Sequence, residues 1–148
     1  VPLRHVKPHG ALYNMPAKDE KLARAVVEGI CEVDDRLILL ALSGSEMLLA
    51  AEKAGLRAAS EVFADRGYQS DGTLVPRTQP GAMITDETLA IERVVRMVTE
   101  GIVTAVDGTD IPLRADSICV HGDGEKALLF VRNIRAALEA KGVALRAL

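Results

Sequence analysis

Short apolar runs alternate with longer amphipathic segments along this chain, and that alternation limits the folds open to it. The clearest apolar run, residues 37–42, contains no polar side chain and is typical of a strand buried on both faces. Strands that alternate with helices pair in parallel through right-handed crossovers, so we predict an α/β fold with mostly parallel strands. The expected strands are residues 3–7, 37–42, 58–64, 103–106, 111–113, 117–120 and 143–148, and the expected helices are residues 17–32, 46–54, 86–100 and 124–141.

Two parts of this pattern carry further expectations. Residues 65–85 contain three glycines and two prolines, so we expect an irregular loop, which at this length inside a compact domain is usually functional or mobile. We expect Thr85 to cap the helix that follows. The last expected helix has apolar residues at helical spacing and should bury them on one face: Leu128, Val131, Ile134 and Leu138.

Polar clusters follow several of the expected strands. They lie at residues 7–9, 43–45, 65–66 and 121–123, and all three histidines of the chain fall in or beside the first and last of them. In folds of this kind the catalytic groups lie at the carboxyl ends of the strands, which share one edge of the sheet. We therefore expect these turns to converge on one site.

The first cluster combines a cation, an imidazole and two polar side chains. Lys7 has the charge to neutralise a carboxylate or a phosphate, and His9 can exchange a proton near neutral pH. We take both as catalytic candidates, and Tyr13 and Asn14 as candidates for binding substrate. The alternative is that His9 only hydrogen-bonds its own turn.

The second cluster follows the expected strand 58–64 and extends into the irregular loop. Asp65 is a candidate catalytic base or the ion-pair partner of Arg66, whose guanidinium suits a carboxylate. Glu61 lies inside the strand and needs a cation nearby if it is buried. We take Glu61, Arg66, Tyr68 and Arg77 as substrate-binding candidates, with a structural ion pair, or for Arg77 a solvated surface charge, as the alternative.

The third cluster contains His121 and Asp123, both catalytic candidates, at the expected start of a helix. A helix N-terminus favours anions, although Asp123 also suits a simple N-cap. His9, His121 and Asp123 are residue types that ligate metals, but no ligand-spacing motif supports a dedicated site, so a divalent metal is kept only as an alternative. The sequence contains no phosphate-binding loop with its lysine, so no self-sufficient nucleotide site is predicted.

Composition narrows the class of protein. The chain has 148 residues, 49% of them hydrophobic, which suits one domain with a substantial aliphatic core. A net charge of −3 without basic clusters argues against nucleic acid as a partner, and no apolar stretch is long enough to span a membrane. Cys31 and Cys119 have no metal spacing and are expected to be buried, reduced thiols of a cytoplasmic protein. The chain begins at Val1 without an initiator Met, so we expect it to lack its beginning.

Four motifs together resemble the LamB/YcsF family in order and spacing. They are VKPHGALYN at residues 6–14, EVFADRGY at residues 61–68, GTLVPR at residues 72–77 and CVHGD at residues 119–123. The resemblance runs through nearly the whole chain, and the nine-residue first motif is highly specific. It implies a single LamB/YcsF domain over residues 1–148, with a partial (β/α) barrel related to those of glycoside hydrolases and polysaccharide deacetylases.

The resemblance also implies an activity and partners. The family is the A subunit of a prokaryotic 5-oxoprolinase, which opens the lactam of 5-oxo-L-proline to L-glutamate with ATP as co-substrate, acts with subunits B and C, and is cytoplasmic. Family members are about 250 residues long, and their first part is not matched here, so the resemblance implies a domain truncated at its N-terminus. The missing strands would complete the barrel and supply further acids and histidines.

Within that reaction the residue types suggest roles. Arg66 or Arg77 suits the substrate carboxylate, Lys7 and the amides near Gly122 suit a developing oxyanion, and His9 or Asp123 suits the base for water. Two other interpretations stay open: a metal-dependent amide or carbohydrate deacetylase, and a non-catalytic fragment that only binds partner subunits. In the last case, open edges at strands 3–7 and 144–147 would favour a homo-oligomer.

Overall fold

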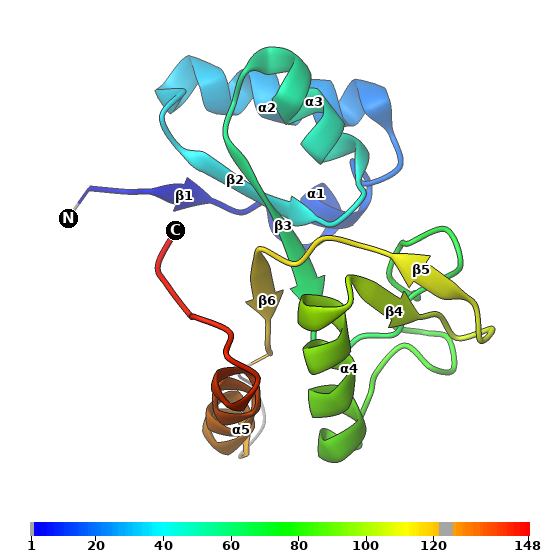
Figure 1. Ribbon diagram of the computed structural model, residues 1–148. Helices are drawn as coiled ribbons and strands as arrows, with labels where there is room; N and C mark the ends of the chain where they lie inside the picture. Colours follow the sequence, from blue (N-terminus) through cyan, green and yellow to red (C-terminus); the bar gives the residue numbers. More distant parts are fainter. Residues whose placement is uncertain (1, 122–125) are drawn as a thin grey trace. The chain divides into compact units, whose positions relative to one another are not determined.

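A computed structural model describes residues 2–121 and 126–148 of the chain (Figure 1). The chain divides into two compact units, one comprising residues 1–61 with Leu148 and the other comprising Val62–Ala147. Four strands form a sheet in the order β1-β2-β3-β6, and strand β3, Ala58–Phe63, runs from the first unit into the second. The predicted α/β class with a partial, mainly parallel sheet is confirmed.

The first unit is built on three parallel strands. The apolar run predicted at residues 37–42 forms β2, and four of its five residues are buried. It pairs with β1 through Leu39 and Val6 and with β3 through Leu42 and Glu61. The remaining elements of this unit are β1 (His5–Val6), α1 (Ala11–Asn14), α2 (Glu20–Asp34), β2 (Ile38–Leu42) and α3 (Glu46–Ala54).

Local signals in the sequence set the limits of these helices. Helix α2 begins where the carboxylate of Asp19 accepts a hydrogen bond from the backbone N–H of Leu22, and it buries Ala23 and Val27. Helix α3 ends at Gly55, whose φ of 72° requires the left-handed region that glycine adopts without a steric penalty. The predicted span 46–54 for α3 is therefore confirmed, whereas the short helix α1 was not predicted.

The second unit packs two helices beside the end of β3. The backbone N–H of Ala64 donates to the carbonyl of Cys119 at 3.1 Å, which ties the end of β3 to β6. A core of aliphatic side chains forms around Ala64, Val94, Ile134 and Leu138. The remaining elements of this unit are α4 (Glu87–Thr99), β4 (Ile102–Thr104), β5 (Asp110–Pro112), β6 (Ser117–Cys119) and α5 (Ala127–Ala140).

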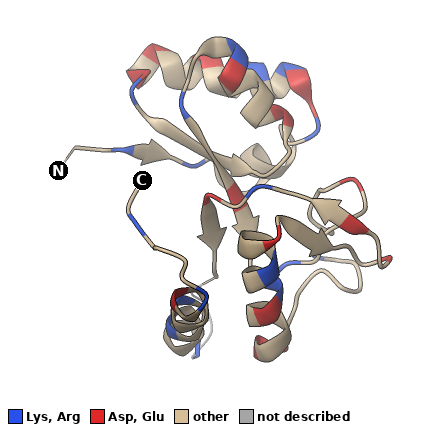
Figure 2. Cartoon of the chain, in the orientation of Figure 1, with Lys and Arg blue, Asp and Glu red and all other residues tan. Residues whose placement is uncertain are grey.

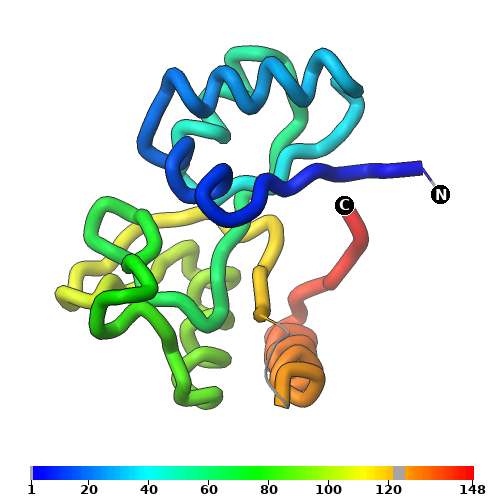
Figure 3. The backbone as a smooth tube through the Cα atoms, turned by 180° about the vertical axis from the view of Figure 1, so that it is seen from behind, coloured from blue at the N-terminus to red at the C-terminus, as the bar shows by residue number. Residues whose placement is uncertain are grey.

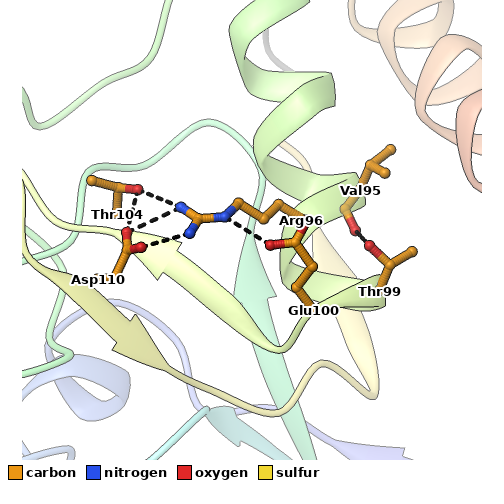
Figure 4. Close-up of polar contacts among 6 residues, drawn as sticks. All are labelled: Val95, Arg96, Thr99, Glu100, Thr104 and Asp110. Carbon is orange, nitrogen blue, oxygen red and sulfur yellow. Dashed lines mark hydrogen bonds and ion pairs between the residues drawn. The ribbon is translucent and has the colours of Figure 1, made fainter.

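Strands β4 and β5 form the predicted hairpin, which is antiparallel and is fastened to α4 by Arg96. The Arg96 guanidinium donates to both carboxylate oxygens of Asp110, at 2.6 and 3.0 Å, and also to Thr104 and Glu100 (Figure 4). Charges of both signs lie along α4 and α2 (Figure 2), so each helix presents a mixed rather than a basic surface.

The segment between β3 and α4 is irregular, as predicted. It turns back on itself through two isolated bridges, between Arg66 and Met83 and between Tyr68 and Leu74 (Figure 3, green). Gly67 sits where the segment crosses itself, because a Cβ added there would lie 2.0 Å from the carbonyl oxygen of Gly81. Only a residue without a side chain fits between these two backbone stretches.

Several local expectations are wrong. Residues 143–148 form no strand, so the predicted edge at residues 144–147 does not exist. Asp86, not Thr85, caps α4, because its carboxylate accepts from the backbone N–H of Leu89 and it lies one residue nearer the helix. Cys31 and Cys119 are not joined in a disulfide, and each is half-buried rather than buried as predicted.

Helix α5 buries only part of the face predicted for it. Ile134 and Leu138 are in the core, whereas Leu128 is 64% exposed and Val131 is 45% exposed. The neighbouring Leu129 is exposed as well. The apolar spacing correctly indicated a helix, but the first half of that helix has little to pack against among the described residues. None of the helices in the described ranges has the length and apolar character needed to cross a bilayer.

Candidate functional site

Glu61, on β3 in the first unit, is the centre of one polar cluster. Its side chain is 4% exposed, and its two carboxylate oxygens have different partners. The Lys7 ammonium lies 2.7 Å from Oε1, and the Tyr13 hydroxyl donates to Oε2 at 2.8 Å. The Lys7 nitrogen also lies 5.3 Å from the centroid of the Tyr13 ring, within range of a cation–π contact. We call Lys7, Tyr13 and Glu61 the Glu61 cluster.

This cluster satisfies the requirement that the sequence placed on Glu61. A buried carboxylate is costly unless a cation and hydrogen-bond donors compensate it, and Lys7 and Tyr13 supply both. The Lys7 side chain remains 32% exposed, while its ammonium is held by the buried carboxylate.

The two other candidates of the first motif lie apart from these contacts. Asn14 is exposed, and its amide donates to the carbonyl of Gly10 at 3.0 Å, which closes the turn before α1. Gly10 itself has a φ of 60°. His9 is exposed on the same turn, and the structure gives it no contact that favours catalysis over the alternative that it serves the turn.

Asp65 and His121 meet in the second unit, as the strand-end argument predicted. Nδ1 of His121 lies 2.7 Å from Oδ2 and 2.9 Å from Oδ1 of Asp65, and Nε2 of His121 lies 3.2 Å from Nη2 of Arg77. Asp65 directly follows Ala64, whose backbone N–H bonds to Cys119 of β6, and His121 comes two residues after β6 ends. The pairing of these strands therefore sets the distance between the two side chains. We call Asp65, His121 and Arg77 the Asp65–His121–Arg77 array.

The partners assign the tautomer of His121. A guanidinium can only donate hydrogen bonds, so Nε2 accepts from Arg77 and the Nδ1 proton is donated to Asp65. The imidazole is therefore neutral, with a carboxylate orienting it from behind. An imidazole held in this way has the geometry of a general base whose basic nitrogen is Nε2.

The array lines a pocket of about 280 Å³ in the second unit. Its polar lining residues include the array, Glu87 and Lys126, and its apolar ones include Met83, Ile84 and Phe130. Glu87 is held by the amide of Asn133, which donates to it at 2.6 Å. The pocket is lined by Asp65, Arg77, Met83, Ile84, Thr85, Glu87, His121, Lys126, Ala127 and Phe130.

Sequence reasoning missed the pocket residues that come from the helix ends. The sequence marks Glu87 only as an acid in the first turn of α4, and it does not single out Lys126 or Phe130. One signal in the sequence could have identified them. Helices α4 and α5 each begin after a loop that follows a strand, so their first residues lie at the same edge of the sheet as Asp65 and His121.

Arg66 and Tyr68 are both buried and serve the loop rather than the pocket. The Arg66 guanidinium donates to the carbonyls of Ala82 and Val75, at 3.1 and 2.7 Å. Burial lowers the pKa of Arg66, and the nearby Arg77 adds to that effect. The Tyr68 hydroxyl accepts from the backbone N–H of Phe63 at 2.9 Å. This geometry favours structural roles for two residues proposed to bind substrate.

Arg93 on α4 completes the support of this loop. Its guanidinium donates to the backbone carbonyl of Arg66 at 3.2 and 3.3 Å. Burial lowers its pKa, which remains far above neutral because an arginine side chain does not lose its proton in proteins. The base of the loop is therefore held by the buried guanidinium of Arg66 and the half-buried guanidinium of Arg93, neither of which was assigned this role from the sequence.

Asp123, a catalytic candidate and one of the residue types considered for metal binding, lies outside the described residues. In the parts of the chain that are described, no group of three or more His, Cys, Asp or Glu side chains is placed to hold a metal ion. The divalent metal therefore stays an unsupported alternative.

Comparison with known proteins matches residues 1–148 to the LamB/YcsF family. The chain belongs to the LamB/YcsF family. It is 60% identical over 143 residues to a Clostridium beijerinckii protein named as the A subunit of 5-oxoprolinase, covering 97% of this chain and 56% of that protein. A Bacillus subtilis protein of the same name is 51% identical over 146 residues, covering 99% of this chain and 57% of that protein.

A solved structure supports the same assignment. A lactam utilization protein from Thermus thermophilus matches with a TM-score of 0.87 and 44% sequence identity, covering 100% of this chain and 59% of that protein. The chain therefore spans a little over half the length of the LamB/YcsF proteins it matches. In this family member, three of the four motifs supply the array, because Asp65, Arg77 and His121 come from the motifs at residues 61–68, 72–77 and 119–123.

Proposed function

We propose that this chain carries part of the catalytic site of the 5-oxoprolinase component that hydrolyses the lactam 5-oxo-L-proline to L-glutamate with cleavage of ATP. The observation that carries the proposal is the Asp65–His121–Arg77 array beside a small pocket, in a chain 60% identical to a protein named for that component. The partners would be subunits B and C of the same cytoplasmic enzyme.

The chemistry sets what the site must provide. Transfer of the ATP γ-phosphoryl group to the lactam oxygen forms the new P–O bond and releases ADP. Water then adds to the activated carbon, and cleavage of the C–N bond, with the nitrogen taking a proton, gives an acyl phosphate. A second water cleaves the acyl phosphate to the side-chain carboxylate and inorganic phosphate. The site therefore needs a base for water and a cation for the substrate carboxylate.

The array suits these needs. Once its lone pair is free, Nε2 of His121 can take a proton from water, while Asp65 holds the ring and stabilises the imidazolium that forms. Arg77 has the planar fork that binds a carboxylate through two hydrogen bonds. His121 thus replaces His9 as the preferred base, because Asp65 orients the ring of His121 and no carboxylate of the described residues contacts the ring of His9.

The pocket favours the lactam over the nucleotide. A volume of about 280 Å³ lies just below the roughly 300–1,000 Å³ typical of pockets for drug-sized ligands. A molecule as small as 5-oxo-L-proline suits this space far better than ATP does. We therefore propose that the nucleotide is bound with the help of residues outside this pocket, including those of partner subunits.

A chimera tests the proposal directly. This chain replaces the 143 matching residues of the Clostridium beijerinckii protein, and the chimera is combined with the partner subunits of that organism. We expect formation of L-glutamate and ADP that depends on 5-oxo-L-proline, with the unmodified relative as the positive control. A folded chimera that assembles with its partners and yields no glutamate would contradict the proposal.

Asp65→Asn in the same chimera tests the role of the array. Loss of the carboxylate that orients His121 should lower kcat by roughly 10²- to 10⁴-fold, the usual contribution of a positioned general base. Asp35→Asn is the matched control, because Asp35 is exposed at the end of α2 in the first unit. Equal kcat values for the two variants would remove His121 from the chemistry.

A further inference from the structure

The basic nitrogen of His121 is already occupied in the structure. Nε2 accepts a hydrogen bond from Nη2 of Arg77 at 3.2 Å, while Nδ1 donates to Asp65. A neutral imidazole has one lone pair in the ring plane, and Arg77 uses it. In this arrangement His121 cannot accept a proton from water, although it is otherwise oriented as a base.

We propose that Arg77 masks the base until a carboxylate-bearing ligand enters the pocket and draws the guanidinium away from Nε2. The inference rests on the proposed function, because it takes His121 as the base, and it names the ligand class as a small carboxylate. Arg77 then has two successive partners, the imidazole in the free protein and the ligand carboxylate in the complex.

The exchange of partners is favoured by the strength of the two contacts. Arg77 makes one hydrogen bond to a neutral imidazole, whereas a carboxylate carries the opposite charge and accepts two parallel bonds from the same guanidinium. The nearby Lys126 lines the same pocket and adds a second positive charge that attracts an anion. The free energy of binding the carboxylate therefore uncovers Nε2.

The position of Arg77 permits this movement. It lies in the irregular segment between β3 and α4, and both its side chain and its contact with His121 are exposed to solvent. Arg66, by contrast, is fixed by two backbone carbonyls at the base of the same loop. One arginine of the loop is therefore committed to structure, and the other is placed to change partners.

Chemical modification of the full chain measures the masking. Diethyl pyrocarbonate acylates an imidazole nitrogen that has an available lone pair, and mass spectrometry of peptides gives a separate rate for each histidine. His5 and His9 are exposed and serve as internal references. We expect Arg77→Gln to raise the rate at His121 by roughly tenfold, the factor set by losing a hydrogen bond from a charged donor. Arg135→Gln, at an exposed position of α5, should leave the rate unchanged.

Nitrogen-15 NMR of the histidine rings tests release by the ligand. We expect 5-oxo-L-proline to move the Nε2 resonance of His121 in the same direction as Arg77→Gln does. 2-Pyrrolidinone, the same lactam ring without the carboxylate, should not produce this change. In Arg77→Gln protein, 5-oxo-L-proline should cause no further movement of that kind, because the mask is already absent.

The outcomes separate this inference from the proposed function. Equal acylation rates at His121 in the wild type and Arg77→Gln overturn the masking. A shift with 2-pyrrolidinone equal to that with 5-oxo-L-proline, or no shift with any carboxylate, overturns release by the carboxylate, while glutamate formation by the chimera still supports the function. If acetate moves the Nε2 resonance but the chimera forms no glutamate, the mask stands and the proposed function falls.

Discussion

The hydroxyl of Tyr13 donates a 2.8 Å hydrogen bond to Oε2 of Glu61, and both side chains are buried. Since the opposite oxygen of the same carboxylate holds Lys7, the position of this partly exposed side chain depends on a phenol that is hidden from solvent. The polar residues of the first motif are therefore linked through one buried acid. A substitution at Tyr13 should therefore alter the position of the Lys7 side chain.

Tyr13→Phe should destabilise the chain by about 1.5–3 kcal/mol, because it removes a hydrogen bond to a buried charged group. The measurement is urea unfolding, repeated with Glu61→Gln and with both changes together. A double-mutant cycle should give a coupling energy of about 1 kcal/mol or more. Glu28→Gln, in an exposed pair on α2, should change stability by less than about 0.5 kcal/mol. Additive effects of the two substitutions would show that the contact contributes nothing.

Arg66→Met should loosen the loop at residues 65–85. The substitution leaves the carbonyl of Val75 without its guanidinium donor in a buried setting, at a cost of about 1–3 kcal/mol. It also removes one of two donors to the carbonyl of Ala82, which still accepts from the backbone N–H of Gly67. Hydrogen exchange should accelerate within this loop before it does so in α2. Arg135→Met on the exposed side of α5 is the matched control. Unchanged exchange in the loop would refute the structural role of Arg66.

Acid should weaken the attachment of the hairpin β4–β5 to α4. Hydrogen bonds from Arg96 and then from Thr104 lower the pKa of Asp110 from 3.8 to about 2 (Figure 4). Because the folded pKa is the lower one, this stabilisation is present above about pH 4 and is lost as the pH falls toward 2. The carboxyl carbon shift of Asp110 should titrate in that range, and salt should reduce the effect because the pair is exposed.

Asp110→Asn checks the origin of that acid dependence. The variant should lose the part of the stability that changes between about pH 4 and 2, whereas Asp35→Asn should keep it. Asp35 is exposed and lies in the first unit, outside the network of Arg96. An identical pH profile for Asp110→Asn and the unmodified chain would show that another group causes the acid dependence.

Two glycines should respond to alanine in opposite directions. At Gly67 the added Cβ would meet the carbonyl oxygen of Gly81 at 2.0 Å, so Gly67→Ala must displace backbone and destabilise the loop. At Gly29, inside α2, nothing lies within 4 Å of the added Cβ, so Gly29→Ala should stabilise by about 0.5–1 kcal/mol. Thermal unfolding of both variants decides the signs. Stabilisation by Gly67→Ala would contradict the close crossing of the loop.

Elements with a strong local pattern were predictable from the sequence. Strand β2 and helix α3 lie within one residue of their predicted limits, because an unbroken apolar run and a terminal glycine are local signals. The first half of α5 shows the limit of such signals. Spacing identifies which side of a helix is apolar, but only the tertiary structure decides how much of that side is covered, and Leu128 and Val131 are not.

The sequence likewise predicted some contacts of the candidate site and could not predict others. Asp65 and His121 could be brought together from the rule that catalytic groups gather at the carboxyl ends of strands. The choice between Arg66 and Arg77 could not be made, since both are arginines of one loop. Only the folded loop reveals that Arg66 is committed to backbone carbonyls while Arg77 reaches the imidazole.

The part of α5 that lines the pocket is its N-terminal end, which is the less stabilised end of that helix. Lys126 precedes the first residue of α5 and makes no side-chain capping bond. Leu128 and Leu129 are exposed, so Phe130 is the first residue of the helix that packs against the core. We expect the first turn of α5 to fray. A ligand bound against Ala127 and Phe130 would stabilise this turn in its helical conformation. Hydrogen-exchange protection in the opening turn of α5 would then report occupancy of the pocket without any measurement of turnover.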